Sequence, residues 1–313
     1  MIVLSSDPDR RTPRMRNVSN SEVTSFLSCR RMYRYAHILN LMPKKTKAPL
    51  YRGTMDHEAF QRYIEARLEG NAHDKAMRAG RSVFVDAVKS DPQRIDEILY
   101  NQMIWDRYME RHQGWPEWRL MSTEQRFELP LTDTLKMVIR YDVMVEDLKQ
   151  GKILIGDWKF HYRFNSPMNH ALNGQMPKYI RVMKANGIEV HGGFLEEVRT
   201  EKLGKEKSAD PKQLWRRTFY FPSNAKMNNM LRQHIATALE IERFRALPEA
   251  DQKAAAIPVL NKYGPCGYCD FAELCNTEND GGDIDLQVEL DFTQNTYGYN
   301  FVESEQQKVI DSL

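Results

Sequence analysis

Residues 136–160 read KMVIRYDVMVEDLKQGKILIGDWKF, and this stretch decides the fold. Over residues 136–146, side chains alternate between an apolar face and a more mixed one, which is the period of a half-buried strand. Asp142 is expected to point away from the apolar face. A turn around residues 149–151 leads into a second strand over residues 153–160. The stretch therefore predicts two neighbouring strands.

The second strand places Asp157 and Lys159 on one face, because they are two residues apart. With Asp142, they form two acids and an amine that can converge. Carboxylates on adjacent strands can bind Mg²⁺ or Mn²⁺, and an ammonium beside them can orient a water and offset charge on a phosphate. The pattern favours metal-dependent phosphodiester hydrolysis. D-x-K is a short motif, so a surface hairpin with ion pairs is the alternative.

All four cysteines of the chain belong to one pattern. Cys266, Cys269 and Cys275 form a C-x2-C-x5-C run, and Cys29 lies near the other end of the chain. Without a signal-peptide pattern, a reducing compartment, the cytoplasm, is expected, where clustered thiols hold metals more often than disulfides. The lone fourth thiol and the wide x5 gap favour a 4Fe-4S centre over zinc. Inert buried thiols are the remaining alternative.

Charge is distributed unevenly along the 313 residues, although the net charge is only +2. Residues 1–52 carry eleven Lys and Arg against three acids, whereas residues 278–313 carry nine acids against one Lys. A basic half can meet phosphates. No apolar run approaches the roughly 18 residues of a membrane span.

A capping box at Ser19 and Glu22 predicts the start of a helix that carries Cys29 and continues to Tyr33. Further helices are predicted over residues 53–68 and within 74–112. Three basic residues flank the cysteine and are predicted to hold a phosphate backbone in a sequence-independent way: Arg30, Arg31 and Arg34.

The order of the motifs resembles that of the RecB-like branch of the PD-(D/E)xK nucleases. His57 in GTMDHE, Asp142 in RYD, the DWK motif and a Q-x3-Y motif at Gln175 and Tyr179 follow one another, enclosed by the four cysteines. More narrowly, the chain looks like the iron-sulfur members, the AddB nuclease domain and the CRISPR-adaptation exonucleases. The resemblance spans about residues 19–276, and the combination carries the specificity.

The resemblance implies an α/β fold with a PD-(D/E)xK restriction-endonuclease-like core, in which helices flank a mixed central sheet. It also implies a helical N-terminal region and a C-terminal iron-sulfur segment. The expected divisions are a flexible basic lead-in (1–18), a helical region (19–118), the nuclease core (119–222), the C-terminal helix and iron-sulfur segment (223–277) and an acidic tail (278–313).

The resemblance also implies roles for individual residues. His57, Asp142 and Asp157 would be metal ligands, and Lys159 would activate the water. Asp157 stands where many members of the superfamily have glutamate. Without the resemblance, His57 would be read as a core histidine. The remaining assignments are the catalytic Gln175 and Tyr179, for which Tyr179 has helix packing as an alternative, and the 4Fe-4S ligands Cys29, Cys266, Cys269 and Cys275.

The expected function is a Mg²⁺- or Mn²⁺-dependent deoxyribonuclease, an exonuclease on single-stranded DNA or free ends, for which the resemblance favours the 5′-to-3′ direction. It would act in DNA repair, recombination, replication or CRISPR-type processing. A structure-specific flap endonuclease is one alternative. A non-catalytic DNA-binding partner of a helicase or recombinase is a second, and a zinc-stabilised adaptor a third.

Overall fold

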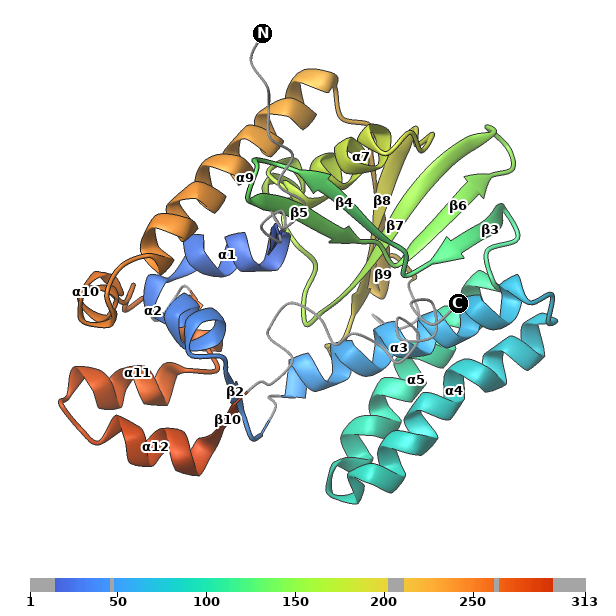
Figure 1. Ribbon diagram of the computed structural model, residues 1–313. Helices are drawn as coiled ribbons and strands as arrows, with labels where there is room; N and C mark the ends of the chain where they lie inside the picture. The colour runs from blue at the N-terminus through green and yellow to red at the C-terminus, as the bar shows by residue number, and fades with distance from the viewer. Residues whose placement is uncertain (1–14, 46–47, 202–210, 262–264, 295–313) are drawn as a thin grey trace, which may run out of the picture.

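A five-stranded mixed sheet lies at the centre of the computed structural model (Figure 1). Its strands are antiparallel to their neighbours except β7 and β8, which run parallel and are joined through helices. A parallel pair requires such a crossover, and the mixed α/β architecture is confirmed. In order across the sheet, the strands are β3 (Trp118–Thr123), β6 (Val143–Asp147), β7 (Lys152–His161), β8 (Gly192–Arg199) and β9 (Trp215–Tyr220).

The structure describes residues 15–45, 48–201, 211–261 and 265–294. Most of the predicted lead-in and the end of the predicted acidic tail therefore lie outside the described residues. Among the described residues, no helix is both long and apolar enough to cross a membrane.

Helices cover both faces of the central sheet (Figure 1). One face packs on α3, α4 and α5, and its core is aromatic: the ring of Phe60 stacks on that of Trp158, with centroids 4.7 Å apart. The other face packs on α7 and α9. Because both faces are covered, residues of β7 are buried in alternation against different helices. These helices are α3 (Ala48–Leu68), α4 (His73–Ser90), α5 (Ile95–His112), α7 (Gln175–Ala185) and α9 (Asn224–Arg245).

The single strand predicted over residues 136–146 is wrong, because the chain forms two strands there. β5 (Leu135–Arg140) belongs to a separate three-stranded sheet with β1 (Arg16–Ser19) and β4 (Arg126–Pro130), whereas β6 belongs to the central sheet. The alternating apolar residues are buried in both halves but enter different cores. A period of two does not reveal the break, since it continues through it. Asp142 lies at this break.

The N-terminal region differs from the prediction at two places. β1 pairs in parallel with β5, so the predicted flexible lead-in is a strand from Arg16 onward, with Val18 fully buried. The helix α1 (Asn20–Ser28) begins as predicted, with Ser19 Oγ accepting from the Glu22 amide at 3.1 Å. It ends at Cys29, whose backbone is extended (φ −164°), and α2 (Arg30–Tyr33) and the π-helical turn η1 (Arg34–Ile38) follow.

The first part of the predicted acidic tail is folded. After α10 (Glu249–Ala255) and η4 (Pro265–Tyr268), the chain forms α11 (Ala272–Asn279), α12 (Ile284–Asp291) and β10 (Phe292–Gln294). β10 pairs antiparallel with β2 (Leu41–Pro43). α11, α12 and β10 surround one apolar cluster, to which η1 and β2 also contribute. The boundary predicted at residue 278 therefore divides a packed unit.

Replacing Phe292 with alanine should destabilise this unit. The Phe292 ring is 7% exposed and stacks on Phe271 with centroids 5.5 Å apart, and truncating a buried phenylalanine costs about 3–5 kcal/mol. Native-state hydrogen exchange of the α11 amides measures the free energy of local opening. Leu290→Ala, at a side chain 62% exposed, is the control and should change it by less than about 0.5 kcal/mol. Equal exchange rates in the two variants would contradict the packing.

Candidate active site

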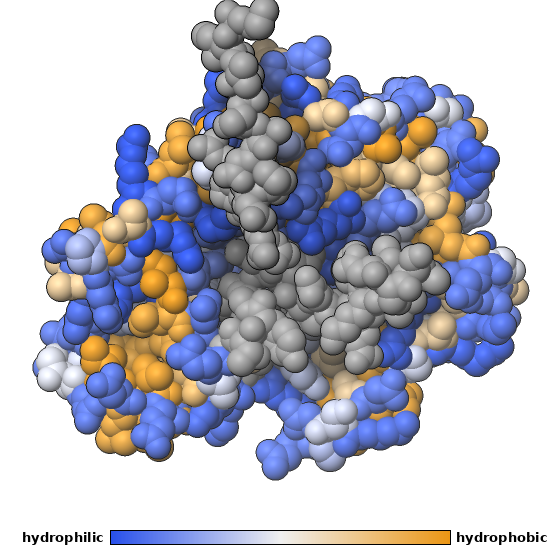
Figure 2. Space-filling model, viewed as in Figure 1, coloured by the Kyte–Doolittle hydropathy of each residue, from blue (hydrophilic) through white to orange (hydrophobic). Residues whose placement is uncertain are grey.

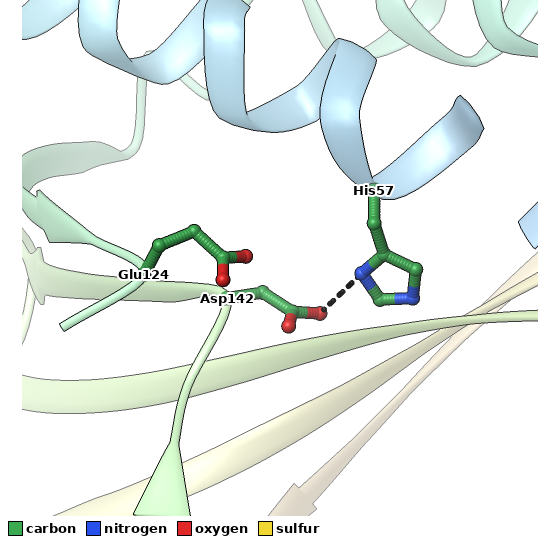
Figure 3. A group of neighbouring side chains, drawn as sticks. All are labelled: His57, Glu124 and Asp142. Carbon is green, nitrogen blue, oxygen red and sulfur yellow. Dashed lines mark ion pairs between the residues drawn. The ribbon is translucent and has the colours of Figure 1, made fainter. Parts of the chain in front are cut away.

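The candidate site forms where helix α3 meets the break between β5 and β6 (Figure 3). His57 points from α3 toward Asp142, and its Nδ1 lies 3.2 Å from Asp142 Oδ2. The Asp142 carboxylate also accepts a hydrogen bond of 2.7 Å from the Trp158 amide on β7. The Asp142 amide donates to the Gly156 carbonyl at 3.2 Å. Asp142 is therefore fixed beside the β7 backbone that carries Asp157.

Asp157 is 3% exposed and holds two of the predicted site residues. Its Oδ2 lies 2.6 Å from Lys159 Nζ, and its Oδ1 accepts from Gln175 Nε2 at 3.0 Å. Gln175 is the first residue of α7, and Tyr179 lies one turn later and is 8% exposed. The structure thus brings together the residues of the predicted motifs from α3, the strand break, β7 and α7.

Glu124 is a site residue that the sequence did not reveal. It lies in the turn between β3 and β4 with a left-handed backbone (φ 52°), and its carboxylate forms a 2.9 Å ion pair with Arg140 Nε. One ligand atom each of His57, Glu124 and Asp142 lies within 4.8 Å of the others (Figure 3). This group contains two of the three predicted ligands, and the assignment of Asp157 as a ligand stays a prediction. Glu124 belongs to no sequence motif, because it is the turn between β3 and β4 that brings it to the site.

Negative charge crowds this group. Burial and the neighbouring Asp142 carboxylate raise the pKa of Glu124 to about 7, against the opposing effect of Arg140. Burial also raises the pKa of Asp157, and Asp142 adds to that shift while Lys159 opposes it. Asp142 differs, since burial would raise its pKa but His57 and Lys159 hold it below the ordinary value. Three carboxylates in one enclosed site are a place where positive charge is favoured.

The two cations of the site respond to that charge. Burial would lower the pKa of His57, but Asp142 raises it to about 9. Burial would likewise lower the pKa of Lys159, and Asp157 and Asp142 raise it instead. In the absence of a cation, both side chains are therefore held as hydrogen-bond donors toward the carboxylates, and His57 would bind a cation only after losing a proton. Carboxylate oxygens suit Mg²⁺ or Mn²⁺, so the residues present fit a divalent cation.

The four cysteines line one cavity of about 310 Å³ between the N-terminal helices and the C-terminal unit. Cys29 comes from the break between α1 and α2, and the others come from η4, the turn after it and α11. Arg31 Nη1 lies 3.8 Å from Cys275 Sγ, and the Asn261 amide donates to Cys266 Sγ at 3.3 Å. N–H donors directed at sulfur are contacts that stabilise thiolates.

The three arginines near Cys29 make contacts within the protein. The Arg30 guanidinium lies over the Phe26 ring at 3.4 Å, and Arg31 pairs with Glu278 at 3.3 Å. Arg34 is 6% exposed. The Arg31–Glu278 pair connects the N-terminal helices to the C-terminal unit. A role of the arginines in DNA binding stays a prediction.

The fold and site define a class: an α/β protein with a half-buried acidic site of the kind that metal-dependent nucleases use. A family model described as the PD-(D/E)XK nuclease superfamily matches residues 17–276. The chain belongs to this superfamily, whose members are metal-dependent hydrolases of nucleic acids, and it is therefore a nuclease.

Two solved structures are similar to the chain at low identity. A candidate exonuclease from Eubacterium rectale has 12% identity and a TM-score of 0.46, with 87% of this chain and 93% of that chain covered. The protein SSO0001 has 14% identity and a TM-score of 0.36, with coverages of 83% and 85%. No curated protein matches the chain.

Proposed function

We propose that the protein is a RecB-like, Mg²⁺- or Mn²⁺-dependent deoxyribonuclease, an exonuclease that acts on single-stranded DNA or DNA ends. The observation that carries the proposal is the convergence of His57, Glu124 and Asp142 beside the Asp157–Lys159 pair. The 5′-to-3′ direction and a place in DNA repair, recombination, replication or CRISPR-type processing come from the family resemblance.

His57, Glu124 and Asp142 would hold the cation, with Asp157 next to them. When bound, a divalent ion polarises a phosphoryl oxygen and offsets charge in the transition state. Lys159, held by Asp157 at 2.6 Å, would donate a hydrogen bond to the attacking water or the phosphate. Gln175 would keep the Asp157 carboxylate oriented through its 3.0 Å bond. Tyr179, enclosed beside both, would pack behind this constellation.

For the four cysteines, we propose a 4Fe-4S cluster with a structural role. All four thiols line one cavity, and they join α1 and α2 to the C-terminal unit. The C-x2-C-x5-C run with a remote fourth thiol favours an all-cysteine iron-sulfur site over the paired knuckles of a structural zinc site. A zinc site is the alternative, and metal analysis of the purified protein distinguishes the two.

End-labelled oligonucleotides with Mn²⁺ test the function directly. We expect single strands with free ends to be shortened from an end, while a circular single strand stays intact. Cleavage of the circle, or cleavage only at the base of a flap, would support the endonuclease alternative. DNA retention without any cleavage would support the binding-subunit alternative.

Glu124→Gln should weaken the apparent affinity for Mn²⁺ about 10- to 100-fold, the range seen when a metal site loses a supporting carboxylate. The change keeps the size of the side chain and removes one of the three charges near the cation. The Mn²⁺ concentration for half-maximal cleavage measures the effect. Glu128→Gln, which removes a carboxylate paired with Lys136 on the neighbouring strand, is the control. Unchanged Mn²⁺ dependence of the first variant would remove Glu124 from the site.

A further inference from the structure

A second polar cluster lies on the same sheet face as Lys159. Glu197 on β8 is in register with Lys159, and Arg216 on β9 is in register with Glu197. Residues opposite each other in a sheet point to the same side, and strands lie about 4.8 Å apart. The three side chains therefore form a row across the sheet. It leads from the proposed catalytic centre to a point about 10 Å away.

Glu197 anchors this cluster. Its side chain is fully buried and accepts from the Asn165 amide at 2.9 Å and from Arg216 Nη2 at 2.6 Å. His170 Nε2 lies 2.9 Å from the same carboxylate. The pKa of Glu197 is lowered, since these hydrogen bonds outweigh burial. A buried, ionised carboxylate with such partners fixes their positions.

One edge of the Arg216 guanidinium is held by hydrogen bonds within the protein, and its other edge is left for a ligand. Its Nε and Nη2 both bond to Glu197, and Nη2 also donates to the Asn165 carbonyl. Its guanidinium lies over the Phe164 ring at 4.9 Å. The side chain is nevertheless 35% exposed. A guanidinium has donors on two edges, and Nη1 makes no hydrogen bond within the part of the chain that the structure describes.

His161 lies next to this row, at its β7 end. It is on the same face of β7, two residues after Lys159, and its Nε2 is 3.9 Å from Glu197. Asn165 Nδ2 lies 3.1 Å from the same ring nitrogen. Burial lowers the pKa of His161, which favours the neutral ring as a hydrogen-bonding group.

The next arginine along β9 shows what a purely structural pair looks like here. Arg217 faces the opposite side, bonds to Glu196 and Glu117, and lies over the Trp118 ring at 4.0 Å. Its side chain is 18% exposed, about half the value for Arg216. Arg216 thus differs in being positioned by a buried acid and still open on the catalytic face.

We propose that Arg216, with His161 beside it, binds a backbone phosphate of the DNA strand adjacent to the phosphate at the catalytic centre, and that Glu197 is its positioning residue. The inference rests on the proposed function for the identity of the substrate. A guanidinium fork matches phosphate oxygens and reads no base. This contact would therefore hold the strand in line with Lys159 without sequence preference.

The test compares Arg216→Ala, Arg216→Lys and Arg119→Ala. Arg119 is 65% exposed on the far edge strand β3 and serves as the matched control. For Mn²⁺-dependent cleavage of a single-stranded oligonucleotide, we expect Arg216→Ala to raise KM about tenfold with kcat changed less than about threefold. The KM of Arg216→Lys should lie between those of Arg216→Ala and the wild type, because lysine keeps the charge but lacks the two-pronged guanidinium.

Binding measured in EDTA separates this inference from the nuclease proposal. The slope of log affinity against log salt should become shallower by about 0.7 for Arg216→Ala, the value for one lost phosphate contact on a single strand. An unchanged slope and KM in a folded variant would overturn the inference. If the protein never cleaves DNA but Arg216→Ala shows this slope change, the phosphate site is supported and the nuclease proposal is refuted. If Arg216→Ala does not fold, the same measurements are made on Arg216→Gln.

Discussion

Replacing Asp157 with alanine is expected to lower Mn²⁺-dependent DNA cleavage by about 10³-fold or more. The change removes the partner of Lys159 at 2.6 Å and of Gln175 at 3.0 Å, and it removes a carboxylate beside the cation site. Loss of one preorganised electrostatic group alone costs about 10²–10³ in rate. Single-turnover cleavage of an end-labelled strand measures the effect. Cleavage at the wild-type rate would refute the assigned site.

The same variant should keep its stability, which separates a catalytic role from a structural one. Asp157 is buried near Asp142, and both burial and that neighbour raise its pKa, so its charge is a cost to the folded protein in the absence of a cation. Functional sites often carry such a cost. We expect a thermal midpoint equal to or above that of the wild type, with DNA still retained at low salt. Asp86→Ala, on the exposed side of α4, should change neither activity nor stability.

Replacing Cys29 with serine is expected to have the largest effect on stability. The residue is the one cysteine contributed by the N-terminal region to the cavity that the four thiols line. Ligand bonds that form only in the folded state contribute their binding energy to folding. A loss of several kcal/mol lowers the thermal midpoint by about 5 °C or more in a chain of this size. Differential scanning calorimetry of protein purified without oxygen measures the change.

Metal content decides what the thiols hold. Brown wild-type protein with about four irons per chain, and colourless Cys29→Ser protein, would support the 4Fe-4S proposal. Colourless wild-type protein that contains zinc would show that the thiols bind zinc and not an iron-sulfur cluster. Metal-free wild type with a thermal midpoint equal to that of the variant would show that the thiols are inert. Because Cys29 lies away from the carboxylates, any cleavage that remains in the variant should keep its Mn²⁺ dependence.

Local sequence predicted the elements whose signals repeat within a few residues. β7 spans Lys152–His161, close to the strand predicted over 153–160, and α7 carries both residues of the Q-x3-Y motif, Gln175 and Tyr179, one turn apart. Asp157 and Lys159 share a face because the period of a strand is two. Ser19 caps α1 because its hydroxyl reaches an amide three residues away. Each of these features depends on neighbours in the chain.

The features that the sequence did not predict depend on distant contacts. The strand break at Asp142 arises because β5 pairs with β1 and β4, whereas β6 pairs with β3 and β7. The helix ends at Cys29 although the residues around it permit a helix. Glu124 joins the site through the turn between two strands. Hydrophobic periodicity carries no information on which sheet a strand joins.

The sequence alone determined which chemical groups this nuclease possesses: the acids and lysine of two motifs, a histidine on a helix and four thiols. Their types and local spacing are properties of the covalent chain. Only the tertiary structure decided that Glu124 stands with His57 and Asp142, and that Arg216 lies in a row with Lys159. The reason is physical: strand pairing and core packing act between residues far apart in sequence, and they set distances of a few ångströms that no local pattern encodes.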